Sequence, residues 1–286
     1  MKKNSTIQVN NVSFSYTNRP FLEEITFEVE HGEIFGFLGP SGAGKSTLQK
    51  ILTGIIRKYN GEAIVDGHST KKITDSFYET IGVDFEFPSL YEKMTALQNL
   101  MFFASLYKNK TRNPEKLLEQ VGLLGDKDKK VSDFSKGMKS RLNFIKSLLH
   151  DPELLFLDEP TSGLDPTNSR IMKDLILEEK KRGKTVILTT HNMEDATELC
   201  DRVAFIVDGK VKALDSPHNL IMRKGAVKVK YTYMDGIERQ GECLIHEMSK
   251  DHRLAALMNA NKITSIHSSE PTLNDIFIDI TGRKLA

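Results

Sequence analysis

A glycine-rich segment, GPSGAGKST at residues 39–47, constrains the fold of this chain more than any other feature. It follows the apolar residues 34–38, so we expect a strand that leads into a tight turn and then into a helix. Gly39, Gly42 and Gly44 permit backbone angles and close approaches that a side chain would block, so amide N–H groups and the positive end of the helix converge on phosphate. The segment therefore predicts a polyphosphate-binding loop.

Two side chains at the end of this segment supply the chemistry that such a site needs. Lys45 is expected to reach the β- and γ-phosphates of a nucleotide, and Ser46 to give its hydroxyl to magnesium. The loop residues that complete the predicted site are Pro40, Ser41, Ala43 and Thr47. The alternative is a glycine-rich surface turn, which the preceding strand makes less favourable.

Composition sets limits on partners and compartment. The 286 residues leave room for about two domains, and a net charge of +1 argues against a nucleic-acid partner bound through a basic face. Cys200 and Cys243 are too few for a disulfide framework, which favours a reducing compartment, and we expect both to pack as small apolar residues. No apolar run approaches eighteen residues, so we predict a soluble chain without direct membrane insertion.

The periodicity of the chain predicts an α/β fold. Residues 12–16 and 25–29 alternate in hydrophobicity, which is typical of an antiparallel sheet. Residues 88–150 have helical periodicity, with a capping box at Thr95 and Gln98 and a third helix that is expected to stop at Asp151 and Pro152. Three apolar runs, at residues 154–157, 186–189 and 203–207, then predict buried parallel strands. A nucleotide-binding core interrupted by a helical insert fits this order.

An acidic pair, Asp158 and Glu159, follows the first of these runs. The carboxyl ends of parallel strands are where open sheets bind ligands, so Asp158 is expected to hold magnesium and Glu159 to polarise the attacking water. His191 ends the next apolar run and is expected to contact the γ-phosphate. The alternatives are solvated carboxylates at a strand end and an incidental histidine.

Two further motifs accompany the acidic pair. Residues 134–138, with the sequence FSKGM, open the third predicted helix, and SGLD at residues 162–165 follows the acidic pair. With them, residues 7–215 resemble the ATP-binding cassette (ABC) transporter ATPases, whose motifs occur here in the family's order. The resemblance implies that Ser135 and Gly137 form a second γ-phosphate site for a facing copy of the chain, and that Asp165 crosses the dimer interface. Read alone, Ser135 is equally an ordinary helix N-cap.

The resemblance also assigns an adenine platform and a departure from the family pattern. Tyr16 matches the aromatic residue on which the base stacks, with a tyrosine packed in the core of an edge strand as the alternative. Glu86 stands where the family has glutamine. A carboxylate can ligate magnesium but cannot donate a hydrogen bond as an amide does, so a slower or more metal-sensitive ATPase is expected. Lys136 and Met138 replace family residues in a way the family tolerates.

Beyond residue 215 the chain changes character. Val227, Val229, Tyr231 and Tyr233 alternate with polar residues, helix signals follow at residues 253–259, and residues 270–282 resemble the C-terminal tail of drug- and lipid-exporter ATPases. A helix capped by Thr272 is expected in that tail. We predict a small α+β accessory domain at residues 216–286, packed on the core or on the dimer mate; a substrate sensor is the alternative.

These expectations combine into one hypothesis. The fold is a P-loop nucleoside triphosphatase core at residues 1–215, with an antiparallel sheet and a helical subdomain at about residues 88–150. The implied function is the ATP- and magnesium-dependent subunit of an exporter, acting as a homodimer beneath separate membrane permease subunits at the cytoplasmic face of the membrane. Residues 87–107, with the aromatic Phe87 and Tyr91, are expected to receive the permease. The alternatives are a mechanical ATPase on DNA or ribosomes and an importer subunit.

Overall fold

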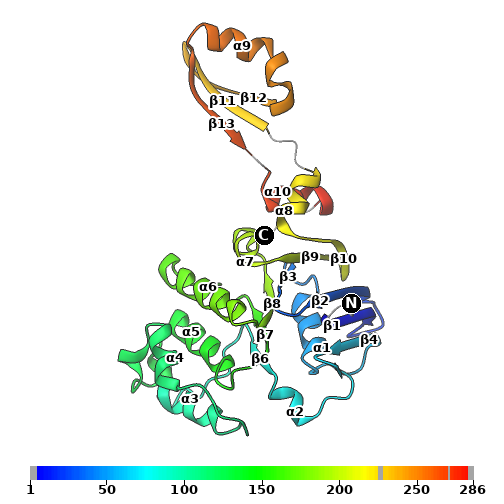
Figure 1. Cartoon of the computed structure of the whole chain (residues 1–286), viewed down its shortest axis with the longest axis vertical. Helices are drawn as coiled ribbons and strands as arrows, with labels where there is room; N and C mark the ends of the chain where they lie inside the picture. The colour runs from blue at the N-terminus through cyan, green and yellow to red at the C-terminus, as the bar shows by residue number, and fades with distance from the viewer. Residues whose placement is uncertain (1–4, 225–227, 270, 283–286) are drawn as a thin grey trace. The chain divides into compact units, whose positions relative to one another are not determined.

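The computed structural model describes residues 5–224, 228–269 and 271–282, and Figure 1 shows the course of the chain. The chain divides into two compact units, the described residues up to Asp215 and those from Ser216 on. Val227 and Glu270, which the sequence analysis placed in a strand and in the C-terminal tail, lie outside the described residues.

An antiparallel sheet opens the first unit. Its strands, in the order β2-β1-β4-β5, are β1 (Ser5–Phe14), β2 (Leu22–Glu30), β4 (Asn60–Val65) and β5 (His68–Ser69). The alternating residues predicted as strands at 12–16 and 25–29 pair here, with Val12 opposite Ile25. The prediction that Tyr16 ends the first strand is wrong, because β1 ends at Phe14 and Tyr16 lies in the following loop.

A six-stranded sheet holds the centre of this unit. It runs in the order β10-β9-β3-β8-β7-β6, from β3 (Ile34–Leu38), β6 (Ile81–Asp84), β7 (Leu154–Asp158), β8 (Thr185–Thr190), β9 (Arg202–Val207) and β10 (Lys210–Asp215). The pairs among β3, β6, β7, β8 and β9 are parallel, which confirms the buried parallel strands predicted from the apolar runs, and β10 joins antiparallel through a turn at Asp208 and Gly209. Parallel pairing brings the ends of β3, β7 and β8 to one edge.

Helix α1 (Lys45–Leu52) lies between the two sheets. Its buried Leu48, Ile51 and Leu52 join one apolar core with residues of both sheets, such as Ile25 and Phe156. Helices α6 (Pro166–Lys181) and α7 (Met193–Leu199) pack against β8 on the other side of the six-stranded sheet (Figure 1), and α2 (Asp75–Tyr78) precedes β6. The sheet is thus covered on both faces, as its apolar strands require.

The helical insert contains α3 (Ala96–Ala104), α4 (Pro114–Gln120) and α5 (Lys136–Ser147). The predicted capping box is present: Thr95 Oγ1 accepts from the Gln98 amide at 3.2 Å and Gln98 Oε1 accepts from the Thr95 amide at 2.9 Å. The predicted end of the third helix at Asp151 is wrong. Helix α5 ends at Ser147, and Asp151 has a left-handed φ of 53°, since the chain must turn there toward β7.

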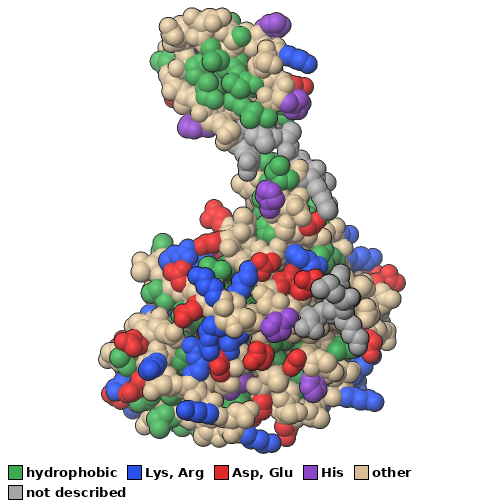
Figure 2. Space-filling view, in the orientation of Figure 1, with side chains coloured by type: hydrophobic (Ala, Val, Ile, Leu, Met, Phe, Trp, Pro, Cys, Tyr) green, Lys and Arg blue, Asp and Glu red, His purple; other side chains and the backbone are tan. Residues whose placement is uncertain are grey.

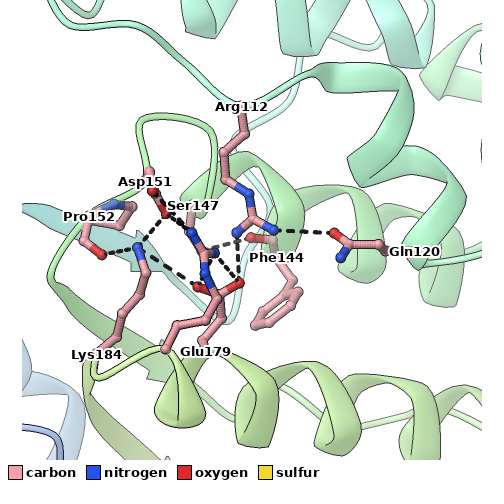
Figure 3. Close-up of polar contacts among 9 residues, drawn as sticks. Arg112, Gln120, Phe144, Ser147, Asp151, Pro152, Glu179 and Lys184 are labelled. Atoms are coloured by element: carbon pink, nitrogen blue, oxygen red, sulfur yellow. Dashed lines mark hydrogen bonds and ion pairs between the residues drawn. The ribbon is translucent and has the colours of Figure 1, made fainter.

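A buried charge cluster holds the insert to the rest of this unit (Figure 3). Glu179 of α6 is 1 % exposed, and its carboxylate accepts from Arg112 at 2.6 Å and from Arg182 at 3.0 Å. Arg182 and Lys184 in turn reach the carboxylate of Asp151, at 2.9 and 2.5 Å. Arg112 lies just before α4, so the cluster joins the insert to α6 and to the turn before β7.

The second unit is a small α+β arrangement. Strands β11 (Lys228–Asp235), β12 (Ile237–Leu244) and β13 (Ile263–Ser269) form an antiparallel sheet in the order β12-β11-β13. Tyr231 and Tyr233 pack against Leu254 of α9 (His252–Asn259), and α8 (Pro217–Lys224) packs on α10 (Leu273–Thr281), which starts at the predicted cap Thr272. The described residues also form three short 3₁₀ helices, Leu124–Asp126, Val131–Asp133 and Ile245–Lys250.

The two cysteines differ in their burial. Cys200 is buried, which raises the pKa of its thiol, whereas Cys243 is only partly buried at the edge of the second unit's core. On the face shown in Figure 2, basic and acidic side chains are interspersed over the first unit and apolar ones gather on part of the second. Among the helices of the described ranges, none has the length and apolar character needed to cross a bilayer.

Candidate nucleotide-binding and catalytic site

The glycine-rich loop connects β3 directly to α1. Gly44 caps α1 with φ 109°, and Gly42, with φ 77°, has no atom within 4 Å of the position a Cβ would take. At Gly39 a Cβ would lie 2.0 Å from the carbonyl oxygen of Ile206, so only glycine fits between the loop and β9. The loop therefore presents open, side-chain-free backbone at the N-terminus of a helix, a geometry suited to phosphate.

Lys45 is held inside this loop. Its Nζ donates to the carbonyl oxygens of Gly39 at 2.6 Å and Pro40 at 3.1 Å, and the residue is only 8 % exposed. Burial lowers the pKa of Lys45, while the nearby carboxylates of Glu159, Asp158 and Glu86 act in the opposite direction. The ammonium group thus already lies among the three carboxylates that the sequence assigned to the same site.

The acidic pair and the histidine meet through hydrogen bonds between neighbouring strand ends. The hydroxyl of Thr189 donates to Asp158, and that of Thr190 donates to Glu159 Oε2 at 3.3 Å. Glu159 has a left-handed φ of 53°, and its Oε1 lies 2.8 Å from His191 Nδ1. A non-glycine residue rarely adopts this backbone region, so the contacts to Thr190 and His191 must stabilise it. In this conformation the carboxylate of Glu159 lines the cleft.

These residues line one cleft of about 280 Å³. The predicted site residues that it brings together are Ser41, Gly42, Ala43, Gly44, Lys45, Ser46, Thr47, Glu86, Asp158, Glu159 and His191. Phe21 and Ser162 also line it and were not predicted, although Ser162 stands in the quoted SGLD motif. Thr189 and Thr190 were missed as orienting residues; their signal is a hydroxyl pair at a strand end directly before His191.

An aromatic group lies at the loop that follows β1. Tyr16 is 58 % exposed, and its hydroxyl lies 3.0 Å from Thr47 Oγ1. Its ring contacts Phe14 and Phe21 edge to face, with ring centroids 4.7 and 5.3 Å apart. Tyr16 is therefore an exposed ring beside the phosphate loop rather than a core residue.

Six predicted residues do not line this cleft: Tyr16, Gly39 and Pro40, and three at helix starts, Ser135, Gly137 and Asp165. Ser135 caps α5, with its hydroxyl accepting from the Met138 amide at 3.2 Å, so the N-cap that the sequence left as an alternative is present. Gly137 lies in the first turn of α5, where a Cβ would be 3.3 Å from Leu164. Asp165 caps α6, and its hydrogen bonds to Asn168 and Thr167 lower the pKa of its carboxyl. Ser135, Gly137 and Asp165 all lie at helix starts of this unit, where Ser135 and Asp165 are exposed and Gly137 is partly buried.

Both the fold and the cleft fit a nucleoside triphosphate with a divalent cation. A lysine and open backbone amides line the cleft where phosphates would bind, and Ser46 and Asp158 carry the kind of oxygen atom that magnesium prefers alongside substrate phosphates. A carboxylate beside them can act on water. This arrangement defines a P-loop nucleoside triphosphatase.

Comparisons with known proteins narrow this class. Residues 22–162 match the family model described as ABC transporter. The chain is 47 % identical to the fluoroquinolones export ATP-binding protein of Mycobacterium tuberculosis, over 98 % of this chain and 94 % of that protein. It is 34 % identical to the Nod factor export ATP-binding protein I of Rhizobium meliloti, over 99 % and 90 %. A solved ATP-binding subunit of an ABC transporter superposes with a TM-score of 0.70 at 28 % identity, over 77 % of this chain and 93 % of that one.

The chain therefore belongs to the ABC transporter family, as an ATP-binding subunit that hydrolyses ATP. The resemblance read from the sequence motifs is confirmed, and so is the P-loop fold.

Proposed function

We propose that this protein is the ATP-hydrolysing subunit of an exporter and works as a magnesium-dependent homodimer bound to separate membrane subunits. The cleft is the observation that supports nucleotide hydrolysis, because the glycine-rich loop, the acidic pair and the histidine all line it. Export is supported by the relatives named as fluoroquinolone and Nod factor export ATP-binding proteins, which match almost the whole chain.

The residues then take distinct roles. Lys45 and the loop amides neutralise charge on the γ-phosphate, and Glu159 accepts a proton from the attacking water. His191, held by Glu159 through Nδ1, contacts the γ-phosphate. Magnesium would be held by Ser46 and Asp158, with Glu86, which lines the same cleft, as the third candidate ligand, and would supply positive charge to the phosphates. The ring of Tyr16 would stack on the adenine.

The second copy completes the site. Ser135, Gly137 and Asp165 lie outside the cleft of their own chain, at two exposed helix starts. We assign them to the cleft of the facing copy, where the amide end of α5 meets the γ-phosphate. In the same proposal the first unit is the ATPase domain and the second an accessory domain.

The membrane subunit is proposed to dock on residues 87–107. Phe87 is 80 % exposed and Tyr91 49 % exposed, beside helix α3. This docking would hold the chain at the cytoplasmic face of the membrane as a peripheral subunit.

The function is tested by isolating the affinity-tagged chain in mild detergent from the cell that encodes it. We expect copurification of an integral membrane protein with several apolar segments, and a more than tenfold loss of it for Phe87→Glu, because a charge on an apolar contact is costly to desolvate. The matched control is Met222→Glu, which places the same charge on an exposed apolar residue of the second unit. Met222 is 54 % exposed. A wild-type chain that captures no membrane protein, or Phe87→Glu that captures as much, would contradict the assignment.

A prediction for Glu86 follows from its place in the cleft. Glu86→Gln restores an amide that can donate to the γ-phosphate or to water, and one hydrogen bond of about 1 kcal/mol corresponds to roughly fivefold in rate. We therefore expect Glu86→Gln to raise turnover about two- to tenfold and to alter the magnesium dependence. Steady-state ATPase assays across a magnesium titration measure both. Identical curves for the two proteins would exclude a special role for Glu86.

A further inference from the structure

A second cavity, of about 240 Å³, lies next to the nucleotide cleft and shares Glu86, Asp158, Glu159 and Ser162 with it. Asp84 and Asn143 line it from opposite elements, the end of β6 and the middle of α5. Both are almost fully buried, at 4 % and 2 % exposed. Buried polar side chains need hydrogen-bond partners, and the hydrogen bonds of Asp84 and Asn143 form a connected network.

Asn143 is the centre of that network. Its Nδ2 donates to Asp84 Oδ1 and to the carbonyl oxygen of Phe85, the latter at 3.2 Å. Its Oδ1 accepts from Lys146 Nζ at 2.6 Å. The donor side of the amide thus joins α5 to the end of β6, and its acceptor oxygen holds Lys146 of the same helix.

Lys146 extends the contacts past Glu86. Its Nζ also donates to the carbonyl oxygen of Ser89 at 3.2 Å and lies 4.9 Å from the centroid of the Phe103 ring. Two side chains of α5 therefore hold the backbone on both sides of Glu86, at Phe85 and at Ser89. Helix α5 begins after Ser135, eight residues and about 12 Å before Asn143.

Asp84 and Lys146 carry charged groups, and removing one of them would leave the other without compensation. Asp84 is almost fully buried and Lys146 is partly buried, so both charged groups lose part of their hydration, and the contacts to Asn143 replace some of it. An apolar side chain at the end of β6 would carry no such desolvation cost, so the stability of the fold does not require a charged residue there.

We propose that Asp84, Asn143 and Lys146 are positioning residues that fix the Glu86 segment to helix α5. Placement of Glu86 at the nucleotide of one copy and placement of the Ser135 end of α5 at the nucleotide of the other are then set together. The inference rests on the proposed dimer and adds a residue-level link between its two half-sites. None of the three residues is assigned contact with substrate.

The test separates nucleotide binding by one chain from assembly of the two. Asn143→Leu keeps the volume and removes every hydrogen bond of the amide. We expect its affinity for a fluorescent ATP analogue, measured on the monomer, to stay within threefold of wild type. Turnover per folded molecule should fall at least tenfold, and the ATP-induced dimer of Glu159→Gln should be weakened at least tenfold when Asn143→Leu is added. Sedimentation velocity measures the last quantity.

Two further variants distinguish positioning from general destabilisation. Asp84→Leu should lose turnover as Asn143→Leu does, whereas Asp84→Asn, which keeps an acceptor oxygen for Asn143, should recover most of it. Tyr59→Phe is the matched control, since it removes a buried hydrogen bond of 2.7 Å to Thr70, and neither residue lines either cavity. Its turnover should equal that of wild type at a similar loss of Tm. If Asn143→Leu does not fold, Lys146→Met is measured in its place with the same expected result.

The experiment distinguishes failure of the proposed function from failure of the positioning role. If Glu159→Gln itself forms no ATP-dependent dimer, the proposed function fails. If that dimer forms and Asn143→Leu, or Lys146→Met in its place, changes neither turnover nor dimerisation, only the positioning role is overturned.

Discussion

Glu159→Gln is expected to bind ATP normally and to lose at least a hundredfold in turnover. Glu159 is the carboxylate proposed to act on the attacking water, and a neutral amide cannot accept the proton, which is a contribution of about 10²- to 10⁴-fold. Its hydrogen bonds to Thr190 and His191 can be kept by glutamine, so the cleft should remain intact. With hydrolysis blocked, saturating ATP and magnesium should hold two chains together. Sedimentation velocity should then show twice the mass of the 32.3 kDa monomer.

The control for this variant lies next to the other end of the same strand. Glu153→Gln makes the identical change just before the opposite end of β7, where the side chain is exposed. Its turnover should match wild type, and it should not accumulate as a dimer. Unimpaired turnover in Glu159→Gln would remove Glu159 from the catalytic role, and a purely monomeric protein would remove the facing-copy site at Ser135.

The largest expected loss of stability comes from Glu179. Its carboxylate is 1 % exposed and receives Arg112 and Arg182, with Lys184 at 3.8 Å (Figure 3). Glu179→Ala leaves these cations around a buried site without their shared acceptor, and loss of one partner from a buried ion pair costs about 3–5 kcal/mol. Urea denaturation should show this decrease in the free energy of unfolding, and Glu179→Gln, which keeps volume and one acceptor oxygen, should fall in between.

The matched control is a network of similar composition on the surface of the same helix. Arg170 of α6 contacts Asp174 and Glu198 and is half exposed. Because solvent screens such pairs, Arg170→Ala should leave Tm essentially unchanged. Equal stability of Glu179→Ala and wild type would show that the buried cluster does not hold the insert in place.

Much of the fold could be predicted from short segments of the sequence. The loop before α1, the caps at Thr95 and Thr272 and the apolar runs of β7 and β8 all follow from short segments. Each of these features depends on backbone freedom, periodicity or a hydrogen bond within a few residues, which a sequence states directly. The end of α5 was missed for the complementary reason, since the turn at Asp151 is set by its pairing with Arg182 and Lys184.

The sequence by itself determined the chemistry of this protein: the phosphate loop, the acidic pair and the histidine, and with them the family. Only the tertiary structure decided which side chains meet, as with Asn143 and Asp84, 59 residues apart, or Arg112 and Glu179, 67 residues apart. Strand order and helix packing bring such pairs together. Because that order arises from the whole chain's burial of its apolar surface, no local pattern encodes it.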